Sequence, residues 1–250
     1  MKIKNILVSQ PPPIDLEKSP YAELAKKHNF GVDFLKFFAI EEIKSTEFRK
    51  DRINLSEYDA VIFTSRNAVD HYFRICKEMR YEVPDTMKYF CNSEAIALYL
   101  QKYIQYRKRK IFYGKQTNQE LIEVLKKHKN NKTLLPCSDL QKLDLTKLLE
   151  KNKIKYTRAI IYKTISVDLS QVDLNKYQML VLFSPAGVRS LFDNYPEFVQ
   201  GETIIAAFGA ITAKALKEFG LTLNIAAPTK TAPAMSVAIE QYLEKNCKKK

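Results

Sequence analysis

Short apolar runs alternate regularly with segments of helical periodicity along most of this chain, and this alternation restricts its possible folds more than any other feature. Runs expected to form strands occur at residues 5–9, 59–64, 88–91, 110–113, 132–136, 178–183, 203–208 and 223–226. Segments expected to form helices occur at residues 67–77, 93–103, 118–127, 187–194, 211–219 and 232–244. Most of the strand runs are continuously apolar, which is typical of strands whose sheet is covered on both faces. The pattern therefore predicts an α/β protein built on parallel sheets.

The chain also contains a weak internal repeat. Residues 59–73 resemble residues 178–192, because each stretch has an apolar strand, then a serine, then a helix. Two further pairs match in the same order, residues 87–100 with 204–217 and residues 110–125 with 222–239. Three matched strand–turn–helix units predict two similar parallel-sheet α/β domains, each a copy of one layout. We expect an active-site cleft between them.

Two extended segments lie on either side of the first copy and set the expected domain boundaries. Residues 34–43 are largely apolar, and residues 155–166 are rich in β-branched and aromatic side chains, which favour strands. We expect them to pair as a two-stranded antiparallel β ladder that connects the domains. Domain 1 would then be discontinuous, with residues 1–37 and 167–250, and domain 2 would be inserted at residues 41–157.

Glycine, cysteine and histidine usage argues against several common classes of enzyme. The chain has 6 glycines, and none of them is spaced as in the GxGxxG or Walker A nucleotide-binding loops. Its 4 cysteines lie far apart and its 3 histidines share no metal-ligand spacing, so we predict no metal site and no cofactor. No apolar run approaches the ~20 residues of a membrane span, and the N-terminal apolar stretch is too short for a secretory signal. We therefore expect a cytoplasmic protein that contacts no membrane.

The formal net charge of +13 arises mainly from local basic runs. They are residues 107–110, the four lysines within residues 126–132, and the tail at residues 248–250. The simplest interpretation of these runs is a solvated helix end together with a flexible basic tail. Two other interpretations remain open: a surface that binds nucleic acid, or a positively charged region that attracts a polyanionic small molecule. The aromatic residues around the first run alternate as in a buried strand, so we do not infer nucleic-acid binding from them.

The turns that follow the expected strands are the strongest candidates for ligand binding. Ligands of open parallel sheets bind beyond the carboxyl ends of the strands, where helix N-termini present free backbone N–H groups to anions. Ser184 followed by Pro185 is typical of such a helix start. The candidate binding residues are Thr64, Ser65, Arg66, Asn67, Asn92, Ser93, Ser138, Asp139, Ser184, Pro185, Ala186, Gly209, Thr212 and Thr231. The alternative interpretation is that the serines among them only cap helices.

Tyr162 is the candidate catalytic residue. It lies in the second connecting segment, where its side chain could project into the cleft, and a phenol can donate a proton or a hydrogen bond. The competing interpretation is a core tyrosine within a β ladder. Other reactive side chains are expected to be either solvated (His28, His71 and His128) or buried apolar residues without a nucleophilic role (Cys91 and Cys137).

Five motifs occur in order along the chain: VIFTSRNAVDHYF (61–73), AIIYKTI (159–165), VLFSPAGVRSLF (181–192), AAFGAITAKALKEFGL (206–221) and TAPAMSVAI (231–239). In this order and spacing they resemble the uroporphyrinogen-III synthases, and the resemblance covers nearly the whole chain. It implies two α/β domains joined by a two-stranded ladder. It also implies a hydro-lyase of haem biosynthesis, which removes water from the linear tetrapyrrole hydroxymethylbilane, inverts ring D and closes the macrocycle to uroporphyrinogen III.

The resemblance implies roles for individual residues as well. The family's connector tyrosine matches Tyr162, which would assist departure of the hydroxyl group as water, and the threonine of its G-x-x-T-A turn matches Thr212. The glycine usual in the matching turn of the other domain is Asn92 here. Family members use no metal or organic cofactor. The implied partner is a polycarboxylate tetrapyrrole substrate, with possible hand-over from the enzyme that makes hydroxymethylbilane, and we expect a monomer.

Two alternatives from other functional classes stay open at this point. One is a two-lobed protein that binds a small ligand without catalysis, because it would share the same layout. The other is a basic nucleic-acid-binding protein that uses residues 107–110 and 126–132.

Overall fold

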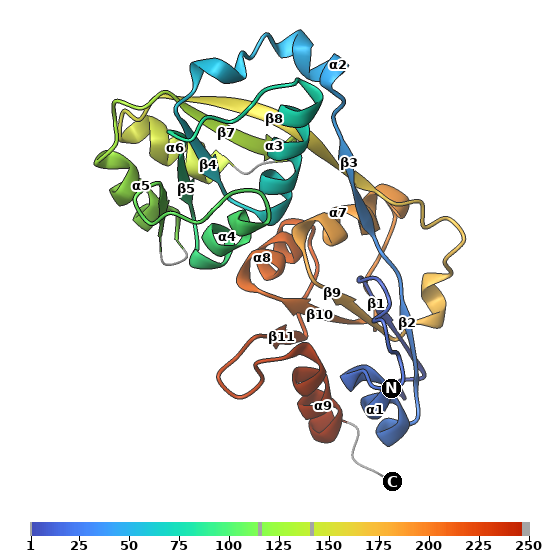
Figure 1. Cartoon of the computed structure of the whole chain (residues 1–250). Helices are drawn as coiled ribbons and strands as arrows, with labels where there is room; N and C mark the ends of the chain where they lie inside the picture. The colour runs from blue at the N-terminus through green and yellow to red at the C-terminus, as the bar shows by residue number, and fades with distance from the viewer. Residues whose placement is uncertain (1, 115–116, 141–142, 247–250) are drawn as a thin grey trace. The chain divides into compact units, whose positions relative to one another are not determined.

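The computed structural model describes residues 2–114, 117–140 and 143–246, which form two compact units (Figure 1). Unit 1 comprises Met1–Ala39 and Ile165–Lys250, and unit 2 comprises Ile40–Thr164. Each unit is an α/β structure with its own sheet, as the alternation of apolar runs and helical segments predicts.

Unit 1 contains a five-stranded sheet in the order β11-β10-β9-β1-β2, with every pair parallel. Its strands are β1 (Asn5–Val8), β2 (Gly31–Phe34), β9 (Met179–Leu182), β10 (Ile204–Phe208) and β11 (Ile225–Ala227). Its helices are α1 (Pro20–His28), α7 (Pro185–Asn194), α8 (Ala210–Glu218) and α9 (Met235–Asn246). Ile6 of β1 packs in a core with α1 and α9, whereas Leu7 packs in a second core with α7 and α8. The helices therefore cover both faces of the sheet, which is why most of its strands are apolar; the edge strand β2, which contains Asp33, is the exception.

Unit 2 contains a six-stranded sheet in the order β3-β8-β7-β4-β5-β6. Its strands are β3 (Phe38–Glu42), β4 (Ala60–Phe63), β5 (Lys88–Cys91), β6 (Ile111–Tyr113), β7 (Thr133–Ser138) and β8 (Tyr156–Ser166). Its helices are α2 (Ser45–Phe48), α3 (Arg66–Glu78), α4 (Glu94–Tyr99), α5 (Asn118–Lys126) and α6 (Leu143–Lys151). Val61 and Phe63 of β4 pack with α2, α3 and α4, while Ile62 packs with α5 and α6 on the opposite face. Short 3-10 helices complete the two units at Arg49–Asp51, Leu55–Glu57, Leu100–Lys102 and Leu174–Lys176.

Strands β3 and β8 connect the units and pair with each other at the edge of the larger sheet. The backbone N–H of Ile43 donates to the carbonyl of Ile161 (3.3 Å), and that of Val167 donates to the carbonyl of Phe37 (2.9 Å). Because one residue number rises as the other falls, the pair is antiparallel. This is the ladder that the two extended segments predicted.

All the predicted strands and helices form, but the first strand of the ladder is shorter than the predicted segment and several elements were missed. Residues 34–43 do not form one extended segment, because Phe34 ends β2 beside Val8 of unit 1 and Phe38 begins β3 in the other sheet. Helix α9 begins at Met235, three residues later than predicted. The missed helices are α1, α2 and α6. In the described part of the chain, none of the helices combines the length and apolar composition that crossing a membrane requires.

Replacing a buried aromatic residue of unit 2 tests the packing of its sheet. Phe63 is fully buried in the core with α3, and its ring stacks against that of Tyr89 at 6.2 Å. We expect Phe63→Ala to lower the free energy of unfolding by about 3–5 kcal/mol, measured by urea denaturation. Leu98→Ala is the control, because Leu98 lies on α4 of the same unit and is 48% exposed. Similar losses in the two variants would contradict this packing.

Candidate active site

Strands β4, β5 and β7 of unit 2 are parallel, so their carboxyl ends lie at one edge of the sheet. Thr64 and Ser65 follow β4, and Asn92 follows β5 with its backbone N–H bonded to the carbonyl of Phe63 (3.2 Å). Ser138 ends β7 at the same edge. The structure thus brings together, within unit 2, several residues that the sequence placed at strand ends.

Ser65 and Ser184 occupy matching positions in the two units, as the internal repeat predicts. Each is the N-cap of the helix that follows its strand, with φ −154° and ψ 159° at Ser65 and φ −155° and ψ 156° at Ser184. The Ser65 hydroxyl accepts a hydrogen bond from the Ala68 N–H (3.0 Å), and the Ser184 hydroxyl accepts one from the Gly187 N–H (3.1 Å). Both serines therefore cap their helices, and Pro185 stands at the first helical position.

A shift in strand register sets the direction of the Tyr162 side chain. Cys137 of β7 pairs with Ile160 of β8, but the next residue, Ser138, pairs with Tyr162. Ile161 is therefore an extra residue on β8, as in a β-bulge. Ile161 and Tyr162 are both buried in the core that contains α3, although neighbouring residues of a regular strand point to opposite faces. The bulge is what turns Tyr162 toward α3.

Tyr162 contacts two residues, Ser65 at the N-cap of α3 and His71 within that helix. Its hydroxyl lies 3.2 Å from the Ser65 hydroxyl, and its ring stacks on that of His71 with centroids 5.0 Å apart and planes at 23°. The side chain is buried, with 5% of the residue exposed. Burial raises the pKa of the Tyr162 phenol, which the Ser65 hydrogen bond only partly offsets, so the phenol is protonated at neutral pH. It can therefore donate a proton or a hydrogen bond at the sheet edge.

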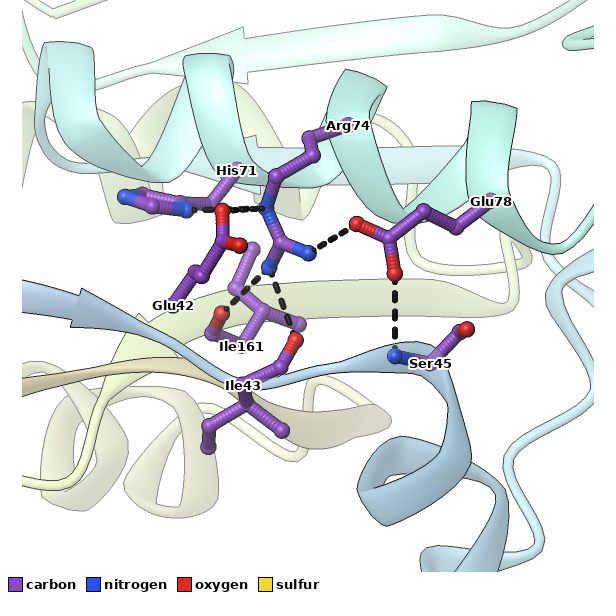
Figure 2. Close-up of polar contacts among 7 residues, drawn as sticks. All are labelled: Glu42, Ile43, Ser45, His71, Arg74, Glu78 and Ile161. Carbon is purple, nitrogen blue, oxygen red and sulfur yellow. Dashed lines mark hydrogen bonds and ion pairs between the residues drawn. The ribbon is translucent and has the colours of Figure 1, made fainter.

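The sequence prediction for His71 was wrong, because this histidine is half-buried rather than solvated. Nδ1 of His71 accepts a hydrogen bond from Nε of Arg74 (3.2 Å), as Figure 2 shows. Burial, and then the nearby guanidinium, lower the pKa of His71 below its usual value. The sequence reasoning also missed Arg74; its spacing of three residues from His71 on a helix was the available signal. His28 and His128 are likewise half-buried, so the same prediction was wrong for them.

Asp139 and Ser138 are held in place by their surroundings. Nη2 of Arg158 donates to the backbone carbonyls of Ser138 (3.2 Å) and Asp139 (3.0 Å). The Asp139 carboxylate accepts the backbone N–H of Thr164 (3.1 Å), and Ser138 is 9% exposed. The backbone of this turn thus contacts the strand that carries Tyr162.

Other predicted residues of unit 2 differ in exposure. Arg66 and Asn67 are exposed at the start of α3, with the Arg66 guanidinium 5.3 Å from the centre of the Tyr99 ring. Ser93 is the N-cap of α4, but its side chain makes no capping hydrogen bond. Oδ1 of Asn92 is buried, and among the described residues it has no hydrogen-bond partner.

The predicted residues of unit 1 lie in the turns after β9, β10 and β11 or in the first turn of the helix that follows. Gly209 has φ +88° and ψ 145° at the start of α8, a backbone conformation that favours glycine, whereas Asn92 does not have a positive φ. This difference explains why the repeat can carry asparagine in one copy. Thr212 is 2% exposed within α8, Ala186 is half-buried in the first turn of α7, and Thr231 is exposed in the loop before α9.

Among the described residues, neither a reactive cysteine nor a metal site is found at the carboxyl ends of these strands. Cys91 and Cys137 are buried, as predicted, and burial raises the pKa of the Cys91 thiol to about 12. Among the residues that the structure describes, no group of three or more His, Cys, Asp or Glu side chains could hold a metal ion.

Comparison with known proteins identifies the family. The family model for uroporphyrinogen-III synthase HemD matches residues 19–236. The chain belongs to the uroporphyrinogen-III synthase family. Its structure is similar to that of a mutant uroporphyrinogen III synthase from the extremely thermophilic bacterium Thermus thermophilus, with a TM-score of 0.66 and 16% identity over 97% of this chain and 100% of that one. It is also similar to a uroporphyrinogen-III synthetase from Helicobacter pylori 26695, with a TM-score of 0.61 and 17% identity over 98% and 100% of the two chains. A comparison with curated proteins found no match.

Two N-cap serines of unit 2, Ser65 and Ser93, are expected to contribute differently to the free energy of unfolding of this family member. Ser65→Ala removes the hydrogen bond to Ala68 and the contact with Tyr162, so the free energy of unfolding should fall by about 1–2 kcal/mol. Ser93→Ala is the matched control, because the Ser93 side chain caps no backbone group and its loss should cost less than about 0.5 kcal/mol. Urea denaturation of both variants measures the difference. Equal losses would show that the Ser65 hydroxyl does not cap α3.

Proposed function

We propose that this protein is an active uroporphyrinogen-III synthase, a hydro-lyase that converts hydroxymethylbilane to uroporphyrinogen III with loss of water and inversion of ring D. The observation that carries the proposal is the family match over residues 19–236. The carboxyl edge of the unit 2 sheet supports it, because a protonated phenol lies there beside a capped helix N-terminus.

The charge of the substrate fits the chemistry of the candidate residues. Hydroxymethylbilane carries an acetate and a propionate on each of its pyrroles, and the protein has a formal net charge of +13. Carboxylates are stabilised by hydroxyl groups, by backbone N–H groups at helix N-termini and by arginine. We assign this binding role to the starts of α3 and α7, with Thr64, Ser65, Arg66 and Asn67 in unit 2 and Ser184, Pro185 and Ala186 in unit 1. The other candidates are Asn92, Ser93, Ser138, Asp139, Gly209, Thr212 and Thr231.

Tyr162 is proposed to assist the loss of water. The phenol donates its proton to the departing hydroxyl group, the C–O bond breaks, and the electron pair leaves with the water molecule. The azafulvene that remains is attacked by ring D through its substituted carbon. This attack forms a spiro intermediate in which ring D is no longer aromatic. The bond from the attacked carbon to the methylene bridge of ring C then breaks, which leaves an azafulvene on ring C, and the unsubstituted α-carbon of ring D attacks that azafulvene. The proton lost from this second carbon restores the aromaticity of ring D and can return to the phenolate. Ser65 supports this step, because its hydroxyl can hydrogen-bond to the phenolate oxygen that forms.

Control of the closing step is the larger part of the proposed catalysis. The azafulvene closes spontaneously to the symmetric type I isomer, so the protein must hold the chain in the geometry that leads to type III. Positioning of reacting groups can contribute several kcal/mol without a strongly perturbed acid or base. A cytoplasmic location, a monomeric state and hand-over from the enzyme that makes hydroxymethylbilane remain predictions.

The isomer distribution of the product tests the proposed function directly. The full-length protein is supplied with hydroxymethylbilane, the products are oxidised, and the type I and type III porphyrins are separated and quantified. We expect predominantly type III. Only type I from a folded sample would mean spontaneous closure and would contradict the proposal.

Removing the Tyr162 hydroxyl tests its catalytic role. We expect Tyr162→Phe to lower kcat for the type III isomer about 100-fold, since general-acid assistance contributes about 10²–10⁴-fold. Tm should change by only a few degrees, because the ring stays and a single hydrogen bond is lost. Tyr89→Phe is the matched control, because Tyr89 is a buried tyrosine of the same core. If both variants keep normal kcat, Tyr162 has no part in the reaction.

A further inference from the structure

We propose that Arg74 and His71 are positioning residues that hold the ring and hydroxyl of Tyr162 in place for the reaction. The inference rests on the proposed function and on the contacts within unit 2 around helix α3 (Figure 2).

The Arg74 guanidinium joins three elements of unit 2. Nη2 donates to the backbone carbonyls of Ile43 (2.9 Å) and Ile161 (3.0 Å), and the side chain is only 20% exposed. Nη1 pairs with the Glu78 carboxylate, which also accepts the backbone N–H of Ser45 (2.9 Å). Every side of the planar guanidinium thus has a partner, a geometry that lysine cannot reproduce.

One of these contacts falls on the bulge that directs Tyr162. Ile161 is the extra residue on β8, and its carbonyl accepts hydrogen bonds from both the Ile43 N–H and Arg74. A bulge disturbs the regular ladder, so its backbone needs partners from elsewhere. Because the Ile161 carbonyl belongs to the peptide group that precedes Tyr162, holding this carbonyl in place also holds the backbone from which the Tyr162 side chain extends.

A second route from Arg74 to Tyr162 runs through His71. Nε of Arg74 can only donate, so the Nδ1 atom that accepts from it carries no proton. The neutral imidazole is therefore the tautomer protonated at Nε2. In this orientation its ring lies against the Tyr162 ring at 5.0 Å. Protonation of Nδ1 would place two donors against each other and break the contact with Arg74.

Charged and titratable groups face His71 from three elements of unit 2, namely α3, β3 and β8. Arg74 and Asp70 lie on α3, Glu42 lies at the end of β3, with Oε2 3.5 Å from Nε of Arg74, and Tyr162 lies on β8. The guanidinium opposes protonation of the imidazole, and the two carboxylates favour it. Removing Arg74 should therefore raise the pKa of His71.

The internal repeat shows that this arrangement is not needed merely to join a helix to the connecting segments. In unit 1 the positions equivalent to His71 and Arg74 are Ser190 and Asp193 on α7. The Ser190 hydroxyl donates to the carbonyl of Phe37, and the Asp193 carboxylate accepts from the Ser166 hydroxyl, so two short side chains make the structural contacts there. The imidazole and guanidinium occur in the copy that contains Tyr162.

Nuclear magnetic resonance of the full-length protein tests the geometry without any activity measurement. The ¹⁵N shifts of the His71 ring, assigned by their loss in His71→Phe, should show an unprotonated Nδ1, a protonated Nε2 and a pKa below the ordinary ~6.5. In Arg74→Met the pKa should rise. Protonation at Nδ1 in the wild type, or an unchanged pKa in the variant, would overturn the inference.

The pH profile of type III formation tests the positioning role. We expect kcat of the wild type to fall at acid pH as His71 becomes protonated, and this acid limb to disappear in His71→Phe. His71→Ala, which also loses the stacked ring, should lower kcat about tenfold at neutral pH with KM within about twofold. Arg74→Met should lower kcat similarly and weaken the acid limb, because protonation of His71 then has no contact with Arg74 to break.

A matched control separates this role from a general effect of losing a histidine. His128 of unit 2 is also half-buried beside an aromatic ring, 4.5 Å from that of Phe112, and burial lowers its pKa. His128→Phe should leave the acid limb in place. If the wild type forms type III but its acid limb persists in His71→Phe and kcat is normal in His71→Ala, the positioning role is wrong while the proposed function holds. If the wild type forms only type I, the proposed function itself has failed and the positioning role fails with it.

Discussion

The parallel direction of the strands is the constraint on which the rest of this structure depends. Because β4, β5 and β7 run in one direction, the polar residues that end them collect at one edge of the unit 2 sheet. Strand β8 is longer than its neighbours, because it pairs on one side with β7 and on the other with the antiparallel β3. It therefore continues past Ser138, the end of β7, and Tyr162 reaches the sheet edge from the middle of a strand.

The sequence is sufficient to predict most of the fold, because continuous apolar strands and amphipathic helices leave clear patterns. It also predicts the two serine turns correctly, since Ser65 and Ser184 each follow a strand and adopt nearly identical backbone angles. Helix α1 was missed although it has a similar start, with Ser19 accepting a hydrogen bond from Ala22 N–H and Pro20 in the first turn. Its apolar face is small, with Leu24 as the buried residue, so periodicity alone does not reveal it.

The finer geometry of the site could not be predicted, because it depends on register and not on composition. An extra residue at Ile161 reverses the face that Tyr162 presents, and a parallel pair carries no local sequence signal for such a shift. The misjudged exposure of His71 has the same origin: the helix pattern places it beside the apolar stripe, but only the bulge puts an aromatic ring against it. Burial of Tyr162 favours the core interpretation as well as the catalytic one, and the hydroxyl beside Ser65 is the feature that distinguishes this tyrosine from Tyr89 in the same core.

Comparison of the two copies separates what the α/β layout needs from what one unit has added. Both copies keep the strand, the serine cap and the apolar face of the following helix. Both also join that helix to a connecting segment, through Ser190 and the Phe37 carbonyl in unit 1 and through Arg74 in unit 2. A partly buried guanidinium costs more desolvation than a serine hydroxyl, and its donors need to be satisfied. Unit 2 satisfies them with two carbonyls, an imidazole nitrogen and a carboxylate, one of the carbonyls being that of the bulge. Such an arrangement is more elaborate than the joint requires, and two of its contacts, those to the Ile161 carbonyl and to His71, lead toward Tyr162.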